Sequence, residues 1–186
     1  MVPSGIFVRT GFDGLADLIV QRLSDHGPFN LRIDYPGGKE PADGMVRVGI
    51  SRWSGKWCRL EVEGAQEGVD LLLEALVAHD PLDEVLTSHF KPEGEEYSYI
   101  LYRDGKVMEK FDSRGPGIES VHFISELRRV PLQTLMSASD FMILSMCEHG
   151  IHRDGEHEEA EAVFIDLTLP GKLTFLQSLL GAVSRR

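Results

Sequence analysis

Period-two alternation of apolar and polar residues predicts three strands in the first half of the chain, at residues 31–35, 46–51 and 58–63. In each segment every second residue is apolar, and those between are mostly charged or small, as in a strand with one face in the core and one in water. Such strands favour an antiparallel sheet, because parallel sheets are usually covered on both faces. Apolar runs at residues 141–147 and 162–169 predict two further strands.

Two short turns join predicted strands into hairpins. Ser54-Gly55 connects the second and third strands, and Asp104-Gly105 separates a strand at 97–103 from one at 107–111. Asp-Gly suits a type I′ turn, because both central residues of that turn take a positive φ. With these strands the sheet is expected to contain about seven strands.

Apolar residues three and four positions apart predict the helices. The clearest helix, at residues 66–79, has a stripe formed by Val69, Leu72, Leu73, Leu76 and Val77. Further stripes predict helices at residues 12–26, 80–90, 118–130 and after Gly171. The chain is therefore expected to be an α+β protein, with a largely antiparallel sheet of about seven strands and helices packed on one face.

A single domain spanning residues 1–186 is the expected organisation, since a chain of this length buries roughly 70% of its unfolded surface. The break Lys91-Pro92-Glu93-Gly94 is a candidate boundary between two sub-blocks, 1–91 and 92–186. Each sub-block contains a strand pair that leads into an amphipathic helix, which leaves an internal duplication open. The predicted core consists of Leu18, Ile33, Val48, Leu60, Leu72, Leu76, Leu101, Ile143, Ile165, Leu176 and Leu180.

Charge and apolar content limit the classes of partner. Thirty acidic residues against 19 basic ones give a net charge of −11, which argues against nucleic-acid binding and fits either a basic protein partner or simple solubility. No apolar run approaches the roughly 18 residues of a membrane span, and the start lacks the pattern of a secretory signal. Cys58 and Cys147 make no disulfide framework, so a cytoplasmic location is expected.

The hairpin around Ser54-Gly55 is a candidate partner-binding surface. Trp57 falls out of phase with the apolar residues that follow it, so it is expected to face away from the first core layer. An exposed tryptophan beside arginine is typical of an interface hot spot and could also stack on a base, although a helix on the other side of the sheet could cover it instead. The residues assigned to this surface are Trp53, Trp57, Arg59, Glu61 and Glu63.

Acidic residues gather in two regions of the sequence. One contains Glu61, Glu63, Glu67, Asp70 and Glu74, and the other lies within residues 148–161. Either could dock into a basic groove, such as the nucleic-acid channel of a nuclease, with carboxylates in the places of phosphates.

Three of the seven histidines fall within nine residues, at His149, His152 and His157. Imidazole and carboxylate are common ligands of zinc and similar divalent metals, so this segment is a candidate metal site. Its spacing matches no standard zinc pattern and the chain has no Cys-x-x-Cys, so a solvated loop or a pH-sensitive contact are the alternatives.

The segment Arg114-Gly115-Pro116-Gly117 lies between a predicted strand and a predicted helix. Free backbone N–H groups at a helix start can hold an anion, and Arg114 would add charge. Arg114, Gly115 and Gly117 therefore form a candidate anion site, although the glycine spacing of dinucleotide folds and the Walker lysine are both missing.

The sequence contains no recognisable catalytic motif, such as Gly-x-Ser-x-Gly. It therefore favours a non-enzymatic, cytoplasmic protein–protein interaction module without a cofactor. The sharpest version is an immunity or antitoxin-like protein that binds and occludes a basic partner. The alternatives are a metal-binding protein or metal-dependent enzyme that uses the His149/His152/His157 loop, and a sensor that holds a small anion near Arg114.

Overall fold

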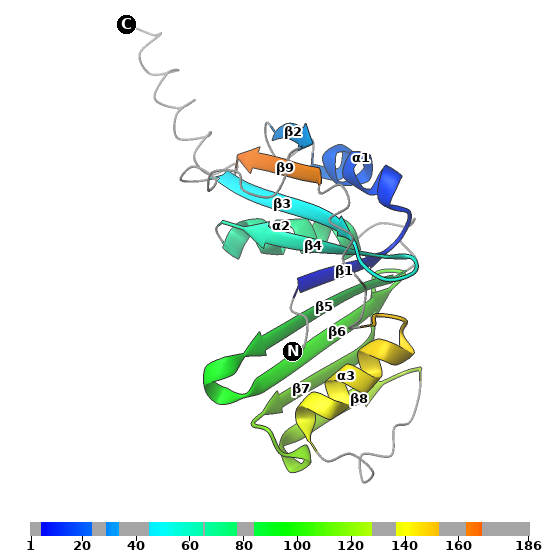
Figure 1. Cartoon of the computed structure of the whole chain (residues 1–186), viewed down its shortest axis with the longest axis vertical. Coiled ribbons are helices and arrows are strands. Elements are labelled where there is room, and N and C mark those ends of the chain that lie inside the picture. Colours follow the sequence, from blue (N-terminus) through cyan, green and yellow to red (C-terminus); the bar gives the residue numbers. More distant parts are fainter. Residues whose placement is uncertain are drawn as a thin grey trace, which may run out of the picture.

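The computed structural model describes residues 5–23, 29–33, 45–64, 66–77, 84–127, 137–152 and 163–168. Within them, nine strands form one antiparallel sheet in the order β2-β9-β3-β4-β1-β5-β6-β7-β8 (Figure 1). The strands are β1 Gly5–Arg9, β2 Phe29–Ile33, β3 Met45–Arg52, β4 Trp57–Glu63, β5 Glu84–Lys91, β6 Glu96–Arg103, β7 Lys106–Arg114, β8 Val121–Ser125 and β9 Val163–Thr168. The helices are α1 Phe12–Leu23, α2 Gln66–Val77 and α3 Ala138–Glu148, with 3₁₀ turns η2 at Pro92–Gly94 and η3 at Ile118–Ser120.

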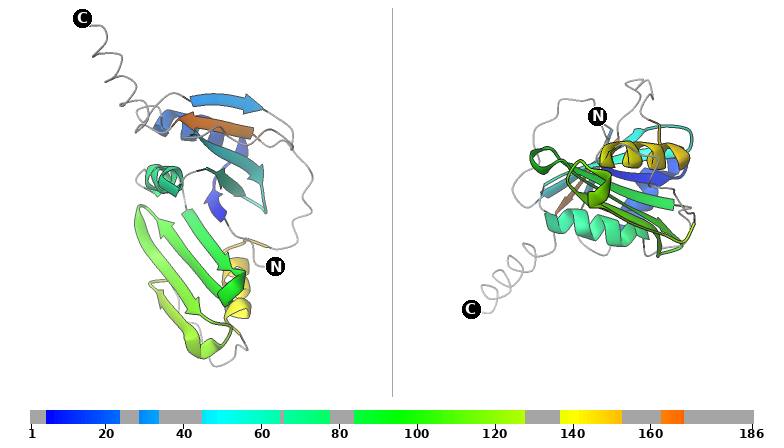
Figure 2. Two further views of the ribbon diagram at one scale, coloured as in Figure 1. Left: turned by 90° about the vertical axis from the view of Figure 1, so that its left-hand side faces the viewer. Right: turned by 90° about the horizontal axis from the view of Figure 1, so that it is seen from below.

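The helices cover opposite faces of the two halves of this sheet (Figures 1 and 2). Helices α1 and α2 pack on β1, β3, β4 and β9, whereas α3 packs on β5, β6 and β7 from the other side. Central strand β1 contributes to both layers, with Ile6 and Val8 in the first and Phe7 in the second. This two-sided arrangement differs from the expected packing on one face, because β1 and β5 have buried apolar residues on both faces, and β4 adds Trp57 to the α3 side.

The α+β class and the antiparallel sheet are confirmed. The helices predicted at 12–26 and 66–79 correspond to α1 and α2. The Asp104-Gly105 turn has φ values of 50° and 73°, as a type I′ turn requires. The break after Lys91 is a connection between adjacent strands, since Lys91 pairs with Glu96 across it.

Two segments predicted as helices are strands. Residues 84–90 of the predicted helix 80–90 lie in β5, where Val85 and Leu86 are buried on opposite faces between β1 and β6. A strand buried on both sides lacks alternation, so its apolar residues also fit helical spacing. In the predicted helix 118–130, η3 and the edge strand β8 occur instead, and Phe123 of β8 packs on Phe141.

One predicted strand is a helix, and one strand is additional. Residues 141–147 lie in α3, which begins after Ser137, whose side chain accepts a hydrogen bond from the Asp140 amide. Periodicity cannot separate a short buried helix from a buried strand, and here the cap sets the start. Strand β1 has no counterpart in the prediction. Six of the predicted strands are present, and β1, β5 and β8 bring the total to nine in the described residues.

Most of the predicted core residues are buried where the structure describes them. Leu18 and Ile143 are only half-buried. The side chains of Ile33, Leu176 and Leu180 lie outside the described part of the chain. The confirmed core residues are Val48, Leu60, Leu72, Leu76, Leu101 and Ile165. No helix in the described ranges is long and apolar enough to cross a membrane.

Charged groups inside the sheet are paired across strands. Arg47 of β3 donates to Asp166 of β9 at 2.8 Å, and both residues are buried. The buried Glu84 carboxylate lies between Arg9 of β1 and Arg103 of β6 and accepts hydrogen bonds from both. Burial alone would raise the pKa of Glu84, but the hydrogen bonds and charges of Arg103 and Arg9 outweigh it and lower the pKa.

The Glu84 ion pairs make stability depend on pH. Because the pKa of Glu84 is lower in the folded state than the unfolded value of about 4.3, the stabilisation is complete above that value and is lost as the pH falls through the folded pKa. Glu84→Gln is expected to lower the free energy of unfolding near pH 7 by about 1–3 kcal/mol. Urea unfolding should show this difference shrinking towards pH 3; a constant difference would contradict the assignment.

Candidate functional site

A pocket opens beside Gly5, the first described residue of β1, between β4 and β5. Gly5 pairs with Ser88 of β5, and Ile6 pairs with Leu60 of β4. Strand β4 continues to Glu63 and β5 to Lys91. These strand ends and the adjoining surface of α2 border a pocket of about 540 Å³, called here the notch.

The notch has an apolar wall and an acidic rim. Val62 of β4 and Val69 and Leu73 of α2 supply the apolar surface, and Glu61, Glu63 and Asp70 supply carboxylates. The described residues that line it are Gly5, Ile6, Leu60, Glu61, Val62, Glu63, Gln66, Val69, Asp70, Leu73, Thr87, Ser88 and His89. Two of the predicted partner-binding residues, Glu61 and Glu63, therefore lie at one site.

The rim is negative overall. Glu61, whose side chain is 61% exposed, forms an ion pair with Arg59 at 2.9 Å. Asp70 accepts a hydrogen bond from Gln66 at 3.1 Å. Among the described residues neither Glu63 nor Asp70 forms an ion pair, so two carboxylate charges are not neutralised within the site. An apolar wall beside such carboxylates suits a partner that carries both cationic and apolar side chains.

Trp57 does not belong to an exposed partner-binding surface; a helix on the other side of the sheet covers it, which was the alternative that the sequence left open. It is 3% exposed and packs in the layer beneath α3, and its indole N–H donates to the His149 carbonyl oxygen at 2.9 Å. The half-buried Trp53 donates similarly to the carbonyl oxygen of His152 at 3.1 Å. Ser54 donates to the Gly150 carbonyl oxygen at 2.8 Å. The hairpin therefore holds the end of α3 in place.

The His149 ring is part of a buried network. Its Nε2 atom lies 3.0 Å from Oε2 of Glu109, a side chain with no exposed surface. The Tyr99 hydroxyl donates to the same oxygen at 3.0 Å, and the Ser125 hydroxyl donates to Oε1 at 3.1 Å. These neighbours give the carboxylate hydrogen-bond donors in a place where an unpaired charge would be costly.

The structure does not assemble the proposed metal site in the residues that it describes. His149 points toward Glu109, whereas His152 is exposed. His157 lies outside the described residues. Among those that are described, no group of three or more His, Cys, Asp or Glu side chains is placed to hold a metal ion.

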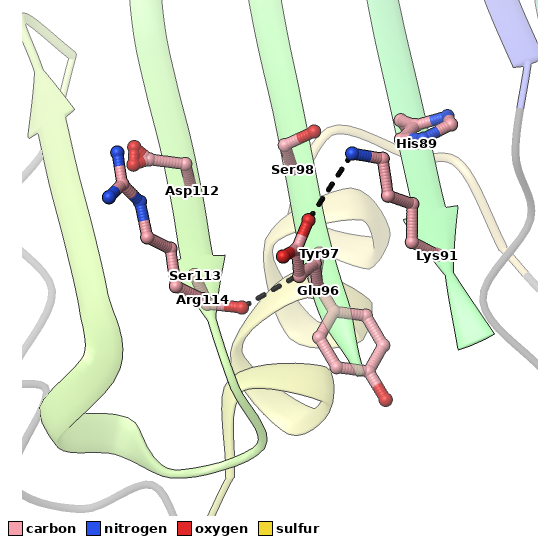
Figure 3. A pocket seen from close by; sticks show the side chains of 8 residues that line it. All are labelled: His89, Lys91, Glu96, Tyr97, Ser98, Asp112, Ser113 and Arg114. Carbon is pink, nitrogen blue, oxygen red and sulfur yellow. Dashed lines mark hydrogen bonds and ion pairs between the residues drawn. The ribbon is translucent and has the colours of Figure 1, made fainter. Parts of the chain in front are cut away.

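The proposed anion site lacks the helix that it needs. Gly115 and Gly117 lead into the 3₁₀ turn η3 rather than an α-helix, and the Ser120 hydroxyl lies 3.0 Å from the Gly115 carbonyl oxygen. Arg114 is exposed and borders a separate shallow pocket of about 250 Å³ on the face of β5–β7 opposite α3 (Figure 3). The site therefore loses the row of helix N–H groups on which the prediction depended.

That shallow pocket contains charges of both signs. Lys91 forms an ion pair with Glu96 at 3.4 Å, drawn as a dashed line in Figure 3. The remaining side chains on this open face are His89, Ser98, Asp112 and Arg114, which come from three neighbouring strands. Cations and carboxylates alternate across the strands, so the pocket does not select one sign of ligand charge.

Cys58 is a buried thiol rather than an exposed nucleophile. It is 2% exposed, and its Sγ atom donates to the Thr10 carbonyl oxygen at 3.5 Å. Burial raises the pKa of the Cys58 thiol. The positive charge of Arg52 lowers this pKa by less, and the negative charge of Asp13 raises it. A raised pKa leaves little thiolate near neutral pH, which is the reactive form.

Strand β1 is the part of the site that the sequence did not reveal. The signal available was the apolar triplet Ile6-Phe7-Val8 after Gly5, which is typical of a short strand buried on both faces. The place of this strand between β4 and β5, which brings the lining of the notch together, depends on pairing between segments remote in sequence.

Trp57→Ala is expected to destabilise the protein by about 3–5 kcal/mol, because it removes a buried ring and leaves the His149 carbonyl without its donor. Ile124→Ala serves as a control, since Ile124 is 56% exposed on β8 and should change stability by less than about 0.5 kcal/mol. Urea unfolding of both variants measures the effect. Wild-type stability of Trp57→Ala would mean that this ring is not part of the core.

The chain matches no protein-family model, no curated protein and no solved structure. The shape and chemistry of the notch are therefore the basis for assigning a function.

Proposed function

We propose that this protein is a protein–protein interaction module that binds a basic partner through the notch. The observation that carries the proposal is the combination of an apolar wall with Glu61, Glu63 and Asp70 around one pocket of about 540 Å³. Pockets of about 300–1,000 Å³ are large enough to enclose several side chains or a small ligand.

The net charge of −11 supports a basic partner over an acidic or neutral one. A negative field speeds encounter with a positively charged surface and disfavours nucleic acid, which carries the same sign of charge. Contact with the apolar wall then supplies the buried area that surface charges alone do not. Val62, Val69 and Leu73 are half-buried in the free protein, so a partner can remove more of their surface from water.

In its finer form, the proposal is that binding is non-enzymatic, takes place in the cytoplasm and occludes the functional groove of the partner, as an immunity or antitoxin-like protein would. A groove that normally holds nucleic acid presents cations at its surface. Carboxylates such as Glu61 and Glu63 can occupy the places of phosphates there. The test of this form is whether the complex removes the partner's own activity.

The experiment begins with native capture of the partner from the cells that make this protein, followed by its identification and purification. The double variant Glu61→Lys/Glu63→Lys is expected to raise the dissociation constant of the purified complex about tenfold or more, because two attractions become repulsions. Calorimetry measures the constant, and increasing ionic strength should weaken the wild-type complex.

Glu119→Lys/Glu126→Lys is the matched control. It makes the same change of net charge at two exposed residues, in η3 and after β8, that do not line the notch. Its dissociation constant should stay close to that of the wild type. An equal loss of affinity in the two double variants would show that total charge alone controls binding. An acidic partner whose affinity neither double variant changes would refute the proposal.

A further inference from the structure

The pocket drawn in Figure 3, called here the sheet pocket, lies on the open face of β5, β6 and β7. Its floor contains Ser98 of the middle strand β6, which lies directly opposite His89 of β5 and Asp112 of β7. Side chains placed opposite each other on one face of a sheet have Cβ atoms about 5 Å apart. One small ligand can therefore contact neighbouring strands together.

The charges that line the sheet pocket are balanced. Among its described lining residues two are cations and two are carboxylates. Lys91 of β5 lies opposite Glu96 of β6, and the two form an ion pair at 3.4 Å. The other two, Asp112 and Arg114, stand two residues apart on β7, so their side chains project from the same face. One charge of each sign therefore remains for a ligand.

Asp112 and Arg114 both keep hydrogen-bonding capacity. Arg114 is exposed and forms no side-chain hydrogen bond or ion pair within the part of the chain that the structure describes, although Figure 3 shows its guanidinium directed toward Asp112. The Asp112 carboxylate lies 3.9 Å from the ring of His122 on β8, which is longer than a hydrogen bond. The side chain of His122 is itself 67% exposed.

The floor of the sheet pocket adds two further polar groups. Neither the Ser98 hydroxyl nor the His89 ring forms a hydrogen bond to any other described residue. A hydroxyl both donates and accepts, so Ser98 can donate to an anionic group of a ligand or accept from a cationic one. His89 is exposed on the opposite side of Ser98 from Asp112.

We propose that the sheet pocket binds a small zwitterion of the class of the free α-amino acids. The ammonium group of the ligand donates to Asp112, and its carboxylate accepts from Arg114, whose planar guanidinium fits a carboxylate with two parallel N–H groups. The Ser98 hydroxyl donates to the same carboxylate. This site is independent of the proposed function, because His89 is the one described lining residue that the sheet pocket shares with the notch.

Size and charge favour a zwitterion over other ligands. A volume of about 250 Å³ lies below the range of about 300–1,000 Å³ in which drug-sized ligands bind, so the occupant is a smaller molecule. A simple anion would be repelled by Asp112, and a simple cation would be repelled by Arg114. A zwitterion satisfies both groups, and its net charge of zero removes the repulsion between an anion and a chain with a net charge of −11.

Three probes of nearly equal size test the proposal on the full-length protein. L-Alanine carries both charges, L-alaninamide carries only the ammonium, and N-acetyl-L-alanine carries only the carboxylate. L-Alanine is expected to bind at least about tenfold more tightly than either analogue, because each analogue forms one of the two charged hydrogen-bonded contacts. Titration followed by the backbone amide chemical shifts of Ser98 and Asp112 measures the three dissociation constants and locates the site.

Two single variants separate the two ends of the ligand. Asp112→Asn should weaken L-alanine and L-alaninamide about tenfold without weakening N-acetyl-L-alanine, because it removes the partner of the ammonium. Arg114→Gln should weaken L-alanine and N-acetyl-L-alanine about tenfold without weakening L-alaninamide.

Lys110→Gln and Glu119→Gln are the matched controls. Lys110 is exposed on β7, two residues before Asp112, and Glu119 is exposed in η3, and neither lines the sheet pocket. Both controls should bind L-alanine as the wild type does. Equal affinity for the three probes, the absence of shifts at Ser98 and Asp112 with all of them, or equal losses in the variants and their controls would overturn the proposal.

Discussion

The rest of the structure depends on the short central strand β1. Val8 and Phe7 are both completely buried, on opposite faces, so this strand lies where the helical cover changes from one side of the sheet to the other. Its neighbours β4 and β5 pair with it on either side. One strand thus joins two apolar layers, and the notch opens beside its first described residue, Gly5.

The acidic residues fall into two groups, those buried inside the fold and those exposed at the rim of the notch. Carboxylates that enter the interior have specific donors: Glu84 has two arginines, Asp166 has Arg47, and Glu109 has hydroxyl and imidazole neighbours. A buried charge without such partners would cost several kcal/mol, so pairing is a condition of folding. At the more exposed rim of the notch, Glu61 pairs with Arg59 and Asp70 accepts from Gln66, and among the described residues Glu63 forms no ion pair.

The candidate site was predictable in its charges and not in its shape. The clustering of Glu61, Glu63 and Asp70 follows from their positions on a strand and the next helix. The sequence correctly placed Trp57 on the opposite face of the sheet from Cys58. Whether that face is exposed or covered depends on α3, which lies about 90 residues later in the chain. His149 was singled out as a metal ligand, whereas its partner Glu109 belongs to a hairpin that local patterns cannot bring near it.

Local patterns determined the α+β class, the hairpin turn at Asp104-Gly105 and helices α1 and α2, because periodicity and turn chemistry act over a few neighbouring residues. They failed for β5, where Val85 and Leu86 are buried on opposite faces, and for α3, whose exposed residue Leu144 is itself apolar. Long-range pairing settled these segments, together with the opposite placement of the helices and the position of β1 between β4 and β5. Which strands become neighbours depends on segments that meet from distant parts of the chain, and no local residue pattern records those meetings.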